Sequence, residues 1–124
     1  MISRVLHKGV WIALVLCISL PAAAQEGRDQ VQAVVDGVRT PQHAHQAAVL
    51  IRQLPGVEMG RVDHNTRNLL LHLSPGSPVT QAQLDQSIAP LGMSLRCYRR
   101  TPLDGIGPFR HLDPRTCDQA PAER

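Results

Sequence analysis

Aromatic residues are almost absent from this chain of 124 residues, which contains one Trp, one Tyr and one Phe. After residue 24 only Tyr98 and Phe109 remain, so the sequence lacks the stacking faces that single-stranded nucleic acid binding requires. Lysine is also missing from this part, where eleven arginines balance ten acidic residues to a net charge of +1. The basic character of the whole chain therefore says little about partners, and we expect no nucleic acid among them.

Catalytic motifs are missing as well. The sequence contains no Gly-x-Ser-x-Gly, no His-Glu-x-x-His and no phosphate-binding glycine loop. His43 and Asp63 could serve as a base and its orienting carboxylate, but no nucleophile accompanies them. We therefore expect that the protein is not an enzyme.

The first 24 residues have the pattern of a secretory signal peptide. A basic start precedes the apolar run 9–20, which is too short to span a bilayer, and the small residues 22–24 suit a signal peptidase. We expect cleavage between Ala24 and Gln25, a periplasmic mature protein and no membrane span after cleavage. Lipidation at Cys17 is the less favoured alternative, because the residue before it is a large leucine.

Two cysteines, Cys97 and Cys117, remain in the mature chain, and disulfides persist in exported proteins. A bridge would close a loop of about 20 residues, contribute roughly 3 kcal/mol and fasten the irregular tail 100–124 to the last strand. Strand alternation would place Cys97 on one face with Met93 and Leu95. The alternative is that Cys97 is a small buried apolar residue and Cys117 a free thiol.

The rest of the chain predicts alternating strands and helices. Thr40 followed by Pro41 marks one helix start, and Thr80 with Gln83 marks another as a capping box. Apolar residues then recur at helical spacing in both segments. Alternating or β-branched residues predict four strands, at 30–38, 57–63, 68–73 and 93–99. The order βαββαβ predicts an α+β, ferredoxin-like sandwich, in which two helices cover one face of a four-stranded antiparallel sheet.

The segment Gly37-Val38-Arg39-Thr40-Pro41-Gln42-His43 stands before the first helix, and Gly56-Val57 opens the following strand. This spacing resembles the heavy-metal-associated domain family, which reads Gly-Met-x-Cys-x-x-Cys, a helix and then Gly-Val. Thr40 and His43 occupy the two cysteine positions. The resemblance covers residues 30–99 and implies the same βαββαβ fold. It also implies a carrier that passes a metal ion to a membrane transporter.

The family's thiolate ligands are replaced here, but an imidazole at the second position can bind copper or zinc. The fold would bring His43, His64 and Met93 to one end of the sheet, where they could form a metal site. His64 would stand off by two strand spacings of about 4.8 Å. His45 lies about 200° around the helix from His43, so these neighbours cannot chelate one ion. This hypothesis implies copper or zinc as cargo and a metal transporter or other periplasmic protein as partner.

The alternative hypothesis is a metal-free structural or protein-interaction module that kept the fold and lost the ligands. Thr40 then serves only as a helix cap, and the histidines are solvated. The partner would contact the exposed sheet face or the edge strand 57–63.

Overall fold

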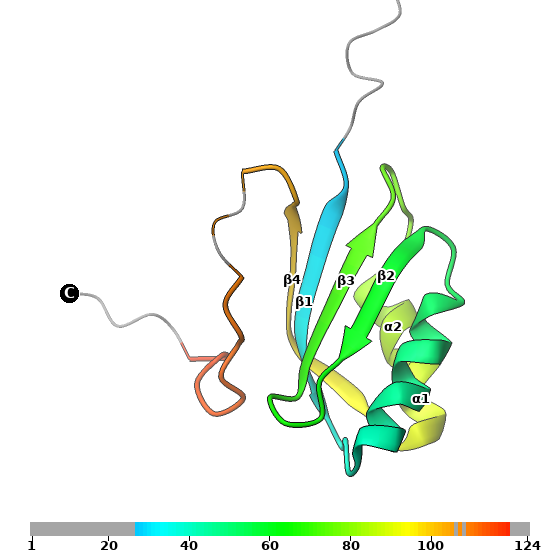
Figure 1. The fold of residues 1–124 in the computed structure, drawn as a ribbon, viewed down its shortest axis with the longest axis vertical. Helices are drawn as coiled ribbons and strands as arrows, with labels where there is room; N and C mark the ends of the chain where they lie inside the picture. The colour runs from blue at the N-terminus through cyan, green and yellow to red at the C-terminus, as the bar shows by residue number, and fades with distance from the viewer. Residues whose placement is uncertain (1–26, 106, 108, 120–124) are drawn as a thin grey trace, which may run out of the picture.

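The computed structural model describes residues 27–105, 107 and 109–119 (Figure 1). The expected signal peptide and its cleavage point lie outside these residues. The elements follow the predicted order: β1 Asp29–Asp36, α1 Pro41–Arg52, β2 Val57–Val62, β3 Asn68–Leu73, α2 Gln81–Ile88, a 3-10 turn Ala89–Leu91 and β4 Ser94–Pro102. Among the described residues, no helix has the length and apolar character needed to cross a membrane.

The four strands form one antiparallel sheet in the order β2-β3-β1-β4. Both helices lie on the same face of this sheet (Figure 1). The structure therefore confirms the predicted ferredoxin-like α+β fold. Strand β4 continues beyond the expected end at Arg99 to Pro102, where its residues still pair with the start of β1.

The core lies between the sheet and the two helices. Alternate residues of β1 and β3 face it, and apolar residues one helical turn apart on α1 and α2 cover them. Each fully buried Val, Leu or Ile side chain stabilises the fold by about 1.5–3 kcal/mol relative to an exposed one. The residues with no solvent exposure include Val31, Ala33, Val35, Ala47, Ile51, Leu69, Leu71, Leu73, Leu84 and Ile88.

Both helices begin at the predicted caps. The Thr40 hydroxyl accepts the His43 N–H at 3.0 Å, and Pro41 occupies the first turn, where no intrahelical donor is lost. At α2, the Thr80 hydroxyl accepts the Gln83 N–H at 3.2 Å, and the Gln83 side chain accepts the Thr80 N–H at 3.0 Å. This reciprocal pair is the capping box that the sequence predicts.

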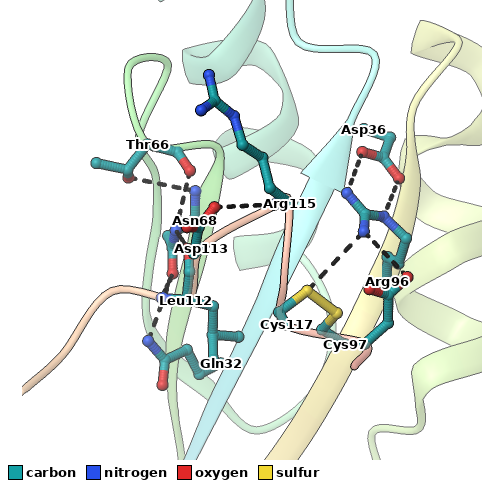
Figure 2. Close-up of a disulfide and its surroundings, with 11 residues drawn as sticks. Gln32, Asp36, Thr66, Asn68, Arg96, Cys97, Leu112, Asp113, Arg115 and Cys117 are labelled. Atoms are coloured by element: carbon teal, nitrogen blue, oxygen red, sulfur yellow. Dashed lines mark hydrogen bonds and ion pairs between the residues drawn. A yellow bond between two sulfur atoms is a disulfide. The ribbon is translucent and has the colours of Figure 1, made fainter. Parts of the chain in front are cut away.

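Strand β4 departs from the predicted alternation at Cys97. Its pairing with β1 shifts register at this point, and Cys97 has a φ of +58°. Met93 and Leu95 are buried in the helix-side core as predicted, whereas Cys97 points away from it toward the tail (Figure 2). The prediction that these three residues share a face is therefore wrong, because the bulge inserts an extra residue into the strand.

After β4 the chain turns back and lies beside the sheet, on the side away from the helices (Figure 1). Because β4 extends to Pro102, we use the name tail from here on for residues 103–119. It contains no helix or strand among its described residues, and the expected disulfide joins Cys117 to Cys97 with the Cα atoms 6.0 Å apart. Leu112 of the tail is only 9% exposed. The sheet face that the sequence suggested as an open contact surface is therefore partly covered.

Candidate functional site

His43, which occupies the second ligand position of the resemblance, lies in the first turn of α1, directly after the loop 37–40. The Arg39 N–H donates to His43 Nδ1 at 3.2 Å, so this nitrogen is an acceptor. The other nitrogen, Nε2, must then carry the proton, and it donates to the Leu91 carbonyl at 2.9 Å. Both nitrogens are thus engaged by backbone groups, and the ring ties the loop to the end of the 3-10 turn.

The glycine of this loop explains why the two segments meet so closely. Gly37 has a φ of +93°, and a Cβ atom there would strike the carbonyl oxygen of Gly92. Only glycine combines this backbone conformation with such a close approach. The loop and the Leu91–Met93 segment therefore form one packed unit around the His43 ring.

Met93, the predicted soft ligand, is 3% exposed and belongs to the core between the sheet and the helices. Its N–H donates to the Ile88 carbonyl at 3.4 Å, which continues the end of α2. A thioether packed this way stabilises the core as an ordinary apolar side chain.

His64 lies in the loop of the β2–β3 hairpin. It lines a hollow between α1 and the hairpin together with His45 and Asp63. The half-turn of about 200° that separates His45 from His43 directs His45 toward the hairpin. The helical spacing of His43 and His45 in the sequence is the signal that points to this placement of His45.

Met93 lies in the core, and the strand order places β3 between β1 and β2, so His43 follows a central strand while the hairpin of His64 ends an edge strand. Within the described residues, no group of three or more His, Cys, Asp or Glu side chains is arranged to hold a metal ion.

Electrostatics at the hairpin are set by Asp63. Its carboxylate accepts the Asn65 N–H at 2.8 Å, and this bond, followed by bonds from Thr66, lowers the pKa of Asp63 below its ordinary value of 3.8. The charge of nearby His111 lowers this pKa further. The carboxylate therefore stays ionised and acts as a fastener of the hairpin turn, because its bonds go to the turn's own backbone.

The tail is fastened to the sheet by polar contacts that the sequence did not predict (Figure 2). The Asn68 side chain donates to the Leu112 carbonyl at 2.9 Å and accepts the Leu112 N–H at 2.8 Å. Asn68 is 3% exposed, so both bonds are buried. The Gln32 side chain donates to the Arg110 carbonyl, which adds a third attachment.

Arg96 adds an ion-pair attachment beside the disulfide (Figure 2). Its guanidinium donates to both Asp36 oxygens, at 2.8 and 3.2 Å, and reaches Asp118 of the tail at 3.5 Å. The bond to Asp36 is the main reason that the pKa of Arg96 is raised above its ordinary range. Arg96 therefore links β1, β4 and the tail.

Comparison with known proteins identifies the fold. No known protein family profile matches the chain, and no curated protein matches it. Among solved structures, the putative copper-ion-binding protein from Bacillus anthracis str. Ames matches with a TM-score of 0.50 and 18% identity, over 57% of this chain and 99% of that chain. The N-terminal domain of a potential copper-translocating P-type ATPase from Bacillus subtilis, in its Cu(I)-loaded state, matches with a TM-score of 0.50 and 14% identity. That match covers 56% of this chain and 85% of the other.

Proposed function

Starting from the fold of heavy-metal-associated domains, which this chain shares with these solved structures, we propose that it serves as a protein-interaction module without a metal site in its first loop. The observation that carries this proposal is the bonding of His43, whose two ring nitrogens contact the backbone of Arg39 and Leu91. A metal at either nitrogen would have to replace one of these bonds. The His43 ring is thus part of the packing between the start of α1 and the 3-10 turn.

Two further residues support the same proposal. Thr40, at the other cysteine position of the resemblance, caps α1 through its hydroxyl, and Met93, a predicted ligand, is packed in the core. The proposed site of action is periplasmic, which the predicted signal peptide and the disulfide support, because disulfides persist in oxidising compartments. The partner is then another periplasmic protein or the exposed part of a membrane protein.

Transition-metal binding is the second candidate function. The hollow between α1 and the hairpin favours it, because two histidines, His45 and His64, line that hollow. Neutral imidazoles suit Cu(II) or Zn(II). Cargo of this kind would make the protein a metal carrier with a membrane transporter as partner, as the family resemblance implies.

Native mass spectrometry during titration with Cu(I), Cu(II) and Zn(II) separates the two candidates. The proposal predicts that wild type and His43→Ala take up metal equally and only weakly. One tight equivalent that is lost in His43→Ala would overturn it. One tight equivalent that is kept in His43→Ala but lost in His45→Ala/His64→Ala would establish the second candidate instead.

A further inference from the structure

The tail creates two hollows on the side of the sheet away from the helices. One, of about 460 Å³, lies between the β2–β3 hairpin and tail residues 111–115. The other, of about 310 Å³, lies between tail residues 109–112 and strands β1 and β4. His111 and Leu112 line both hollows, so the hollows flank this tail segment and form one continuous surface.

This surface carries an excess of positive charge. Among the described residues, Asp113 is the one acidic residue that lines either hollow, and its carboxylate already accepts the Arg115 backbone N–H at 2.9 Å. Four exposed arginines line the two hollows, and in the described part of the chain none forms an ion pair, unlike Arg28, Arg96 and Arg100. The four are Arg67, Arg99, Arg110 and Arg115.

The backbone that presents these arginines is held in place. Arg67, the residue directly before β3, has a φ of +58°, which sets the turn between β2 and β3. The buried Asn68–Leu112 pair and the disulfide at Cys117 fasten the tail on either side of Arg115. The surface is therefore organised before any partner arrives, which lowers the entropic cost of binding.

We propose that this surface docks an acidic segment of a partner protein, with carboxylates in the two hollows on either side of Leu112. This inference rests on the proposed function as an interaction module, and it names the surface and the chemistry of the partner. A guanidinium forms paired hydrogen bonds with a carboxylate, which suits arginine better than lysine for this task. Nucleic acid fits less well, because only two described residues that line the hollows, Phe109 and His111, carry aromatic rings, and these rings pack edge to face against each other with centroids 4.8 Å apart.

Fluorescence anisotropy with a fluorescein-labelled hexaglutamate peptide and the oxidised wild-type protein tests this inference. We expect binding that weakens as salt rises, because exposed ion pairs are screened. Arg67→Gln/Arg115→Gln should bind about tenfold more weakly, since it removes two of the four exposed arginines that can pair with the peptide. Circular dichroism checks that this variant keeps its fold.

Arg39→Gln/Arg61→Gln is the matched control, because it removes the same charge from exposed arginines outside the tail-side surface. This control should bind like wild type; an equal loss would reduce the effect to net charge and overturn the inference. Tighter binding of a charge-matched oligodeoxythymidylate, with the same arginine dependence, would overturn it in favour of nucleic acid. Absence of hexaglutamate binding would also overturn it, while the proposed function would still stand or fall on the metal titration.

Discussion

At the scale of single residues, side-chain amides and carboxylates form hydrogen bonds with backbone groups that a neighbouring strand would otherwise pair. Asn68 begins β3 on the sheet face away from the helices and pairs with both backbone groups of Leu112. Its side chain thereby replaces a neighbouring strand for one residue of the tail. Because the pair is buried, removing the amide would leave the Leu112 N–H and carbonyl without partners.

Asn68→Ala should lower the free energy of unfolding by about 1–3 kcal/mol, the cost of buried polar groups left unpaired. Urea unfolding followed by circular dichroism measures this change. Asn65→Ala, at the exposed hairpin tip, is the control and should change stability by less than about 0.5 kcal/mol. Equal effects of the two substitutions would contradict the role given to Asn68.

Asp63 makes a pH-dependent contribution to stability. Its pKa is lowered in the folded state, mainly by the Asn65 N–H, so the unfolded chain binds more protons. The stabilisation is therefore fully present above 3.8, the ordinary value, and is lost as pH falls through the lowered pKa. Urea unfolding of wild type and Asp63→Asn across this range should show a stability difference that shrinks at acid pH. A difference that stays constant with pH would contradict this account.

At the scale of elements, the central feature is the contact between the first loop and the end of the 3-10 turn. Gly37 permits the close approach to Gly92, and the His43 ring then joins the loop to Leu91. The start of α1 and the 3-10 turn after α2 are thus held together through this loop. In the pattern of the heavy-metal-associated family, the corresponding segment carries the two cysteines. The orientation and the protonated nitrogen of the His43 ring are therefore set by its hydrogen bonds within the protein.

Gly37→Ala should be more destabilising than Gly76→Ala. Both glycines have a positive φ, of +93° and +70°, so alanine costs about 1–2 kcal/mol at either position. Only at Gly37 does the added Cβ also strike backbone, which adds about 1–3 kcal/mol of overpacking. Thermal unfolding of the two variants measures the difference, and equal losses would mean that the loop can move away from Gly92.

The spacing of apolar residues and the capping residues were sufficient to predict the helices and strands. The reason is that the residues that face the helix-side core recur at a single spacing within each element. The bulge at Cys97 was not predictable in this way, since the inserted residue is fixed by pairing with β1 and by the bond to Cys117. The role of His43 depends on a carbonyl 48 residues away, which no local pattern reveals. The arginine surface depends on the path of the tail. In the sequence, only Cys117 indicated where the tail would attach.

At the scale of the whole molecule, the tail covers part of the second face of the sheet (Figure 1). The disulfide, the Asn68–Leu112 pair and the Arg96 ion pairs act at separate points along it (Figure 2). The helix-side core does not depend on these contacts, because it lies on the other face. The tail is therefore an addition to a complete βαββαβ unit.

Cys97→Ser/Cys117→Ser should lower stability by roughly 3 kcal/mol, the value for a loop of this length. Far-UV circular dichroism should keep the wild-type spectrum, while trypsin should cleave after the tail arginines faster than in wild type. Wild type in a strong reductant should behave like the variant. Loss of the whole spectrum in the variant would show instead that the sheet needs the tail in order to fold.

The most direct test of the central claim is the ¹⁵N NMR spectrum of the His43 ring during titration with Zn(II), at a pH where histidine is neutral. We expect a proton on Nε2 and an unprotonated Nδ1, with neither signal changed by stoichiometric metal. A metal-shifted His43 nitrogen, with loss of the bond to Leu91, would contradict it and restore the first loop as a metal site.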